Sequence, residues 1–457
     1  MVSNLERPEM SVTPDLLTEH LLDAARRAGA DAADAMAIAG QSLAIDVRAG
    51  QLEQAERAEG VDIGLRVLVG QRQASVSASD ISASTITALA ERAVAMAREA
   101  PEDLYIGLAS DDLLAKDWDI AALDLCEDAP EPEPAALQEA ARAAEAAAQA
   151  VAGVTQVQSA SAVYDRRQIA LATSAGFAGG YTLTDHGLSC VAIAGQGAGM
   201  ERDHDGDGRV CHADLRSPEE IGRLAGERAV ERLGARKPPT GAYPVLFDER
   251  VARSLIGHLL GAANGASVAR GASWLRDRLG EQVLPEGMDI VEDPHRPRVM
   301  GSRPFDAEGL PTRRRSLVEN GVLTGWILDL ANARKLGLEP TANAKRGVGS
   351  PPSPGSWNIA LTQGTKSRDE LLRDMGTGLL VTSMIGSTIN PNTGDYSRGV
   401  SGFWVENGEV SHAINEGTIA GSLPEFLRRM TPANDARTHL SHVVPSLLVE
   451  GLTLAGA

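Results

Sequence analysis

The clearest structural signal in the chain is Trp404-Val-Glu-Asn-Gly-Glu-Val410, in which Asn-Gly stands between two apolar runs. Asn-Gly accepts the left-handed backbone conformations of a tight turn, so this stretch predicts a β-hairpin. The same chemistry recurs in Leu317-Val-Glu-Asn-Gly-Val-Leu323. With the many glycines and prolines around them, the hairpins predict a large, mostly antiparallel β domain over residues 239–457, with a helix near Asp248–Ala263.

Two smaller α+β units are predicted upstream, over residues 13–127 and 134–236. The first has helices from Thr13 to Ala28 and from Ser82 to Glu99, the second of which has Ser84 or Thr85 available as its cap. Between these helices we expect several short strands, separated by glycines; they are Ala35–Ala39, Leu43–Val47, Val61–Val69 and Ala74–Ala78, with Gly50, Gly60 and Gly70 between them. The linker Asp128-Ala-Pro-Glu-Pro-Glu-Pro134 leads to the second unit, which ends with a helix from Ser217 to about Arg232. The fold class is therefore α+β.

Composition excludes several classes of function. The chain has 457 residues, with 43 basic against 62 acidic side chains, and its formal charge of −19 disfavours general binding to nucleic acid or to anionic membranes. Its 3 cysteines form no CxxC pair, which fits a reducing compartment. Residues Met1 to Pro14 contain no secretory signal, and Leu255–Ala269 is too short and too polar to span a bilayer. We expect a soluble cytoplasmic protein.

One acidic stretch has the spacing of a calcium-binding loop. Asp203-His-Asp205-Gly-Asp207-Gly208 is followed by Asp214 at the last ligand position of an EF-hand. An EF-hand needs a helix on each side, and the preceding residues 189–200 are strand-like and rich in glycine. We therefore expect a solvated acidic hairpin, and whether this loop binds calcium stays open.

The C-terminal third contains several distinctive ordered stretches; they are Ser254-Leu-Ile-Gly-His-Leu-Leu-Gly-Ala262, Pro304-Phe-Asp-Ala-Glu-Gly309, Met375-Gly-Thr-Gly-Leu-Leu-Val381, Thr393-Gly-Asp-Tyr-Ser-Arg-Gly399 and Gly402-Phe-Trp-Val-Glu-Asn-Gly408. In these stretches the chain resembles the TldD/PmbA metalloprotease family, and more closely its PmbA (TldE) branch. The order of the upstream units is similar to that family as well.

The resemblance implies a zinc motif, His-Glu-x-x-x-His, on a helix of the TldD-like subunit, with a later cysteine as a further ligand. Aligned by its Gly-His step, this chain has Arg253 at the first His, Ser254 at the Glu and His258 at the last His. A guanidinium has no lone pair for a metal, serine is no general base, and no cysteine follows Cys211. We therefore expect no catalytic residue and no cofactor in this chain, and zinc in a partner subunit.

The resemblance further implies a paired assembly with a zinc-bearing TldD-like subunit that cleaves unfolded or flexible peptides. Candidate contacts with peptide or partner are Asp395, Tyr396, Ser397 and Arg398 in a glycine-rich turn region, and Arg313 and Arg314 in a basic triplet. Each group also has a plainer interpretation. The first would be a structurally necessary turn, and the second a strand whose arginines simply face solvent. Three alternatives stay open: a metallopeptidase active alone through an atypical metal site, a calcium-binding scaffold, and a homodimer of this chain.

Overall fold

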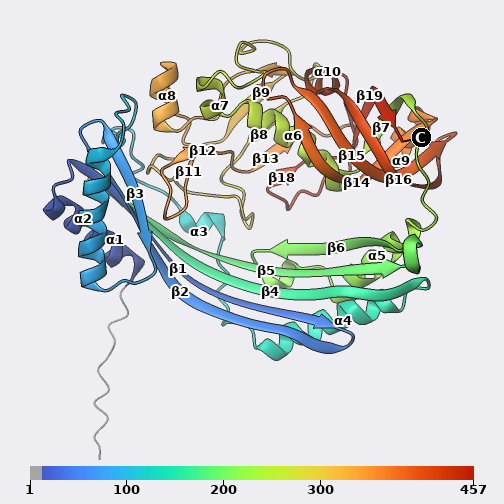
Figure 1. Ribbon diagram of the computed structural model, residues 1–457, viewed down its shortest axis with the longest axis horizontal. Coiled ribbons are helices and arrows are strands. Elements are labelled where there is room, and N and C mark those ends of the chain that lie inside the picture. The colour runs from blue at the N-terminus through green and yellow to red at the C-terminus, as the bar shows by residue number, and fades with distance from the viewer. Residues whose placement is uncertain (1–12, 457) are drawn as a thin grey trace, which may run out of the picture.

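The computed structural model describes residues 13–456. Three domains follow one another along the chain, and the third, rich in β-strands, lies over the concave side of a long curved sheet (Figure 1). Residues 1–12, part of the segment in which no secretory signal is expected, lie outside the described residues. Within residues 13–456, no helix combines the length and apolar character needed to cross a membrane.

The two helices of the first domain lie at one end of the sheet. Helix α1 (Pro14–Ala28) begins at Thr13, whose hydroxyl accepts the Leu16 N–H at 3.4 Å, and it ends at Gly29 with a left-handed φ of 92°. Helix α2 (Ala83–Glu99) is capped by Ser82 rather than by Ser84 or Thr85. Both expected helices are confirmed, and their apolar faces pack on the neighbouring strands.

The strands of the first domain are longer than the sequence predicts. Strand β1 (Ala32–Arg48) and strand β2 (Gln51–Val69) each run unbroken, and β3 (Arg72–Ala78) pairs with the end of β2. The expectation that Gly60 separates two strands is wrong, because Gly60 pairs with Gly40 inside the β1–β2 ladder. A ladder partner thus keeps this glycine extended.

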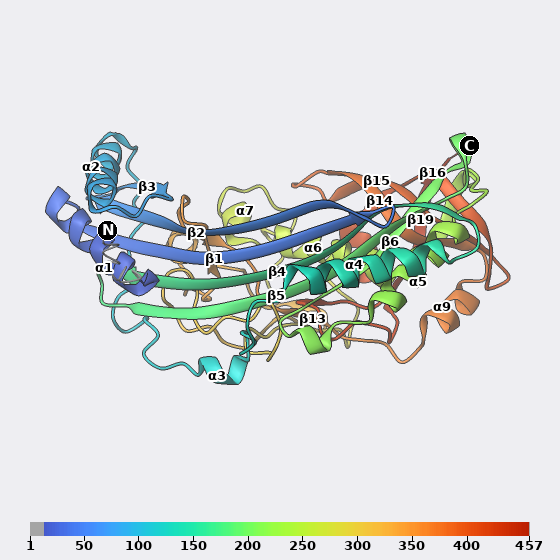
Figure 2. The ribbon, with the colours of Figure 1, turned by 90° about the horizontal axis from the view of Figure 1, so that it is seen from below.

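The central domain continues the same sheet. Strands β4 (Val154–Thr173), β5 (Ala178–Ala194) and β6 (Glu201–Arg209) complete an antiparallel sheet of order β3-β2-β1-β4-β5-β6. The linker at 128–134 therefore falls between two units that share one sheet through the β1–β4 pair. Strand β6 is an edge strand, and Figure 2 shows how far the sheet extends.

Two parallel helices cover the convex face of the central domain, since Gly222 lies against Ala144 and Gly226 against Ala148. They are α4 (Pro134–Gln149) and α5 (Pro218–Glu231), and the short α3 (Ile120–Leu123) comes before the linker at 128–134. Their shared core consists largely of alanines, among them Ala141, Ala144 and Ala225. The helices approach so closely that a Cβ on Gly222 would lie 1.9 Å from the Ala144 carbonyl oxygen.

The C-terminal domain contains two main sheets. The larger has the order β16-β15-β14-β7-β19-β17, and an additional β16–β19 pair closes five of its strands into a ring. Its strands are β7 (Gly241–Phe247), β14 (Gly378–Ile389), β15 (Asp395–Glu406), β16 (Glu409–Ser422), β17 (Thr431–Pro432) and β19 (Leu447–Ala455). Only the β14–β7 pair of this sheet is parallel.

The second sheet has the order β10-β9-β8-β13-β18. Its strands are β8 (Ile290–Glu292), β9 (Arg315–Glu319), β10 (Val322–Leu323), β13 (Ile359–Leu361) and β18 (His442–Val443), and a separate pair joins β11 (Ala344–Lys345) to β12 (Ser353–Pro354). The helices are α6 (Glu249–Ala262), α7 (Gly265–Ala269), α8 (Leu330–Leu336), α9 (Arg368–Met375) and α10 (Leu423–Arg428).

Both expected Asn-Gly hairpins are confirmed. Asn320 and Gly321 have φ values of 48° and 78°, and Asn407 and Gly408 have 56° and 80°. These paired positive angles are those of the tight turn that matches the twist of its flanking strands. The turns join β9 to β10 and β15 to β16.

The C-terminal domain contacts the long sheet through a buried ion cluster. The Asp34 carboxylate on β1 receives Arg66 from β2 and Arg346 from the C-terminal domain, and all three side chains are at most 4% exposed. Nearby, the Val348 carbonyl lies where a Cβ on Gly64 would stand. A buried charge that loses its partner destabilises a protein strongly, so this cluster fixes how the domains meet.

Candidate functional site

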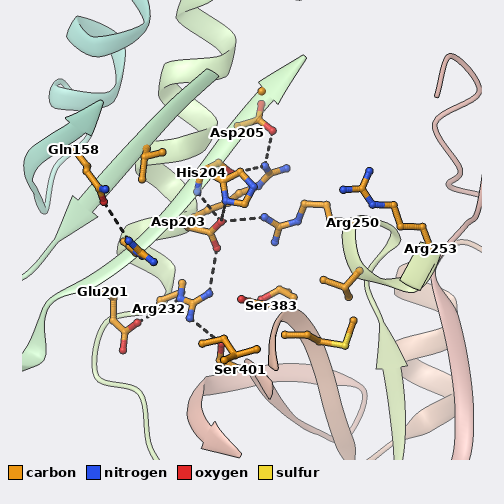
Figure 3. Close-up of a pocket in the computed structure, with 18 of the residues that line it drawn as sticks. Gln158, Glu201, Asp203, His204, Asp205, Arg232, Arg250, Arg253, Ser383 and Ser401 are labelled. Atoms are coloured by element: carbon orange, nitrogen blue, oxygen red, sulfur yellow. Dashed lines mark hydrogen bonds and ion pairs between the residues drawn. The ribbon is translucent and has the colours of Figure 1, made fainter. Parts of the chain in front are cut away.

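A cavity of about 1030 Å³ lies between the central domain and the C-terminal domain (Figure 3). Strand β6 forms one wall, the first turns of α6 form the second, and residues 382–385 of β14 form the third. Arg253 of α6 and Ser383 of β14 reach it from the C-terminal domain, opposite Glu201 and Asp203 of β6. The cavity is thus a seam between two domains, where binding sites often lie.

The acidic residues of β6 are paired with arginines. Asp203 lies 3.5 Å from Arg232 and 3.2 Å from Arg250, and Asp205 lies 2.6 Å from Arg228 and 2.8 Å from Arg216. The third carboxylate, Asp207, lies 3.0 Å from Arg209, and its side chain is 2% exposed. The three aspartates alternate along the strand and so share one face.

This arrangement corrects the expectation of a solvated acidic hairpin. Asp203 and Asp205 are 7% and 3% exposed, and guanidinium groups occupy the carboxylate oxygens that calcium would need. Within residues 13–456, no cluster of three or more His, Cys, Asp or Glu side chains could hold a metal ion. The acidic stretch is therefore part of the structural seam.

Two strand edges border the cavity, and they differ in what covers them. The carbonyls of His204 and Gly206 on β6 accept side-chain hydrogen bonds from Arg228 at 3.2 Å and Arg216 at 2.8 Å. On β14, the pairing with β7 covers only 379–381, and the strand runs on past the cavity to Ile389. Ile385, in this part of β14, is 77% exposed. The β14 edge is therefore the one open to an added strand.

Helix α6 carries the residues aligned with the zinc motif. Its side chains Leu255, Ile256 and Leu259 are buried in the domain core. Arg253 is exposed and lines the cavity, while the Ser254 hydroxyl donates to the Val251 carbonyl at 2.8 Å. The Ser254 proton is therefore held within its own helix.

His258 lies one turn further along α6 and is half-buried. Its ring centroid is 5.7 Å from that of Tyr396, and Nε2 has no hydrogen-bond partner among the described residues. Burial first, and then the positive charge of Arg398, lower the pKa of His258. The structure thus brings together three residues that sequence reasoning selected separately, and it favours the neutral imidazole.

A second histidine near α6 was missed by sequence reasoning. Burial lowers the pKa of His442 on β18, and the positive charges of Lys345 and Arg253 lower it further. His442 therefore lies within electrostatic reach of the exposed end of the α6 motif. No local signal marks it, because β18 is only two residues long and far from α6 in sequence.

Comparison with known proteins identifies the family. Models of three successive domains of the PmbA/TldA metallopeptidases match residues 33–97, 127–233 and 240–456. Over 415 residues the chain is 38% identical to metalloprotease PmbA of Escherichia coli O157:H7, and the match covers 91% of this chain and 90% of that protein. The chain belongs to the PmbA branch of the PmbA/TldD metallopeptidase family.

Further relatives agree in fold. A PmbA homologue of Haemophilus influenzae is 35% identical over 95% of this chain and 94% of its own. A Bacteroides thetaiotaomicron protein of known structure superposes with a TM-score of 0.88 at 25% identity, covering 98% of this chain and 100% of its own. TldE of Thermococcus kodakarensis superposes with a TM-score of 0.83 at 19% identity, covering 96% and 100%. The expected α+β fold class and the expected branch of the PmbA/TldD family are both confirmed.

The residues aligned with the family's zinc motif do not fit a zinc ion. Structural and catalytic zinc sites take at least three ligands from Cys, His, Asp and Glu. Of the three motif residues only His258 is a zinc ligand of these types. Arg253 has no free lone pair, and the Ser254 hydroxyl donates a hydrogen bond to the Val251 carbonyl. We derive no metal-dependent step for this PmbA-branch chain.

The other candidate residues have different places. Arg313 and Arg314 are exposed just before β9 and do not line the cavity, and Arg314 lies 3.8 Å from Asp293. Tyr396 is 2% exposed, so its ring packs in the core. Asp395 is exposed and accepts a hydrogen bond from the Thr393 hydroxyl at 2.6 Å. Ser397 is half-buried on β15 and does not line the cavity, although Ser401 of the same strand does.

Proposed function

We propose that this chain is the non-catalytic, PmbA/TldE-type subunit of a two-component zinc peptidase that cleaves unfolded peptides. Helix α6 carries the proposal, because Arg253, which lines the cavity, and Ser254, whose hydroxyl is bonded to Val251, occupy the positions where a metal ligand and a general base would be needed. In this proposal the chain has no cofactor of its own. The zinc and the catalytic carboxylate belong to a TldD-like partner subunit, and the assembly is cytoplasmic.

The open edge of β14 supports a role in holding the peptide. An extended peptide can add to a free strand edge through main-chain hydrogen bonds, a mode that tolerates many side-chain sequences. Among residues 13–456, no strand pairs with β14 past residue 381 on its β7 side, whereas arginines occupy carbonyls of β6. The exposed Ile385 would give such a peptide an apolar contact. The peptide would thus lie against β14, within the seam.

Association with the partner tests the function. The purified chain, a TldD-like subunit from the same organism and their mixture are compared by size-exclusion chromatography and by cleavage of an unfolded peptide. We expect a stable mixed complex and cleavage that needs both chains. A chain that neither binds the TldD-like subunit nor changes its cleavage would contradict the proposal, and cleavage by the isolated chain would favour a self-sufficient peptidase.

Ile385→Asp tests the place of the peptide. A charge at this exposed position should leave the unfolding temperature unchanged, because no buried contact is lost. It should raise the KM of the complex for an unfolded peptide about tenfold, because the apolar contact is lost and a charge on a strand edge discourages an added strand. The matched control is Leu279→Asp, an apolar side chain 47% exposed that does not line the cavity. If the two substitutions change the KM equally, the peptide does not bind along β14.

A further inference from the structure

A second, smaller cavity lies where the concave face of the long sheet meets the C-terminal domain. Its volume is about 270 Å³, and its floor is apolar, formed by side chains of β1 and β4. Aromatic side chains and four cations complete its lining; they are Tyr181, Phe305, Trp357, Arg167, Arg303, Lys345 and Arg346. Such a concentration of positive charge stands out in a chain whose formal charge is −19.

Aromatic rings hold two of these cations in place. The Arg303 guanidinium lies 5.4 Å from the centroid of Tyr181 and 5.9 Å from that of Trp357, and the Lys345 ammonium lies 4.7 Å from Trp357. Arg303 also donates to the carbonyls of Met300 and Ser302, at 2.9 Å and 2.5 Å. These contacts orient the charges without neutralising them.

The carboxylates nearest the cavity are already engaged. Asp306 accepts backbone N–H groups of Glu308, Leu310 and Ala344 at 2.9 to 3.0 Å. Glu292 accepts bonds from Asn343 at 2.8 Å, from the Trp357 N–H at 2.7 Å and from Arg315 at 2.8 Å.

Arg346 is paired with Asp34, but the other three cations have no such partner. Among residues 13–456, no ion pair within 4.0 Å joins Arg167, Arg303 or Lys345 to a carboxylate. An unpaired cationic cluster walled by aromatic rings is suited to an anion from outside the chain.

We propose that this cavity binds a carboxylate of an extended peptide, with Arg303 and Lys345 receiving its oxygens. This proposal rests on the proposed function: it gives the bound peptide a second contact, in the smaller of the two cavities between the long sheet and the C-terminal domain. The volume of about 270 Å³ lies at the small end of ligand pockets and accommodates a single peptide residue. Both a C-terminal carboxylate and an Asp or Glu side chain have this chemistry.

Protonation of Lys345 on binding of a carboxylate can be measured. Burial and the charge of Arg303 lower the pKa of Lys345 to about 8, opposed by Glu292, and His442 lies within reach as a further titratable neighbour. A carboxylate beside the ammonium favours the charged form and raises that pKa. Binding near pH 8 should therefore take up protons from the solution.

Calorimetry on the full isolated chain tests the site. The probes are a short acetylated Ala-Gly peptide with a free C-terminal carboxylate, the same peptide as its amide, the amide with one internal Glu, and inorganic phosphate. We expect the free acid to bind about tenfold or more tightly than the neutral amide. Binding of the Glu-containing amide in place of the free acid would assign the site to acidic side chains.

Variants separate the cavity from general electrostatics. Lys345→Ala and Arg303→Lys should each weaken binding of the free acid about tenfold, whereas Lys335→Ala, an exposed charge on α8, should not. Lys345→Arg should keep the binding but lose the proton uptake, which two buffers of different ionisation enthalpy reveal. Unfolding temperatures that match the parent would show that these variants are folded.

Three outcomes would overturn the site. They are equal binding of acid and amide, equal weakening by Lys335→Ala, and phosphate binding as tight as that of the carboxylates. Because the isolated chain is titrated, failure here leaves the association with a TldD-like subunit untouched. Failure of that association likewise leaves this result intact.

Discussion

At α6, the side chains that hold the helix and the side chains that face the cavity are different sets. Leu255, Ile256 and Leu259 are at most 1% exposed and pack in the core of the domain. Arg253 and Ser254 lie away from that core. Because burial of the apolar stripe supplies most of the stability of such a helix, the polar positions can change without loss of the fold. This is how a helix of a metallopeptidase family can lack a metal site.

The pKa of His258 is a second property set by single residues. Burial and Arg398 lower its pKa below the ordinary 6.5, so NMR should find a folded-state value beneath that of the unfolded chain. A histidine with a depressed pKa stabilises the fold fully above the unfolded value, and this contribution is lost as pH falls. His258→Gln should therefore reduce the fall in unfolding temperature between neutral and mildly acidic pH.

Arg398→Gln should raise the pKa of His258 only partly towards its ordinary value, because burial is the larger cause. A His258 pKa at or above 6.5 in the parent would contradict this account.

Asp205 is a second residue whose role is testable. It pairs with Arg216 and Arg228, and Asp205→Ala leaves both guanidinium groups without that partner. We expect a loss of about 3 kcal/mol in the free energy of unfolding, measured by urea denaturation. Asp23→Ala, which breaks an exposed pair with Arg26, is the control and should cost less than about 1 kcal/mol. Calcium should leave the unfolding temperature of the parent unchanged. A rise in that temperature with calcium would support calcium binding by the Asp203–Asp214 loop.

At the scale of elements, the contact between α4 and α5 depends on a missing side chain. Gly222→Ala would place a Cβ 1.9 Å from the Ala144 carbonyl oxygen, so the helices must separate. We expect a loss of about 2 kcal/mol or more in the free energy of unfolding, because a packed core tolerates added atoms poorly.

Gly257 on α6 is the matched control for Gly222. It also lies inside a helix, but apart from the adjacent residues and backbone of its own helix nothing lies within 4 Å of where its Cβ would stand. Gly257→Ala should therefore raise stability by about 0.5 to 1 kcal/mol through helix propensity alone. If both alanine substitutions stabilise the protein, the close helix contact does not exist in solution.

Elements defined by adjacent residues were predictable from the sequence. Helices α1 and α5 begin at Thr13 and Ser217 as expected, and both Asn-Gly pairs form their turns, although α2 is capped by Ser82 and not by Ser84 or Thr85. These features depend on the chemistry of a few neighbouring groups. Elements defined by a partner strand were not predictable. Gly60 stays extended because Gly40 lies opposite, and the aspartates of β6 are buried because arginines of α5 and α6 meet them.

At the scale of the molecule, the long sheet and the C-terminal domain enclose two cavities with different chemistry. One borders α6 and the β14 edge, and the other is lined by Arg303, Lys345 and aromatic rings. Each takes its walls from segments far apart in the sequence. The resemblance could therefore select α6 and His258, but Ile385, His442 and the cationic cavity emerge only when the domains are placed together.

Metal content of the isolated chain tests the central claim most directly. The chain is purified without a chelator, dialysed against zinc and assayed by elemental analysis, beside the His258→Ala variant. Because α6 offers one ligand of the required type, we predict far less than one zinc per chain and no difference between parent and variant. One zinc per chain in the parent, lost in His258→Ala together with peptide cleavage, would show that this subunit is itself the metallopeptidase.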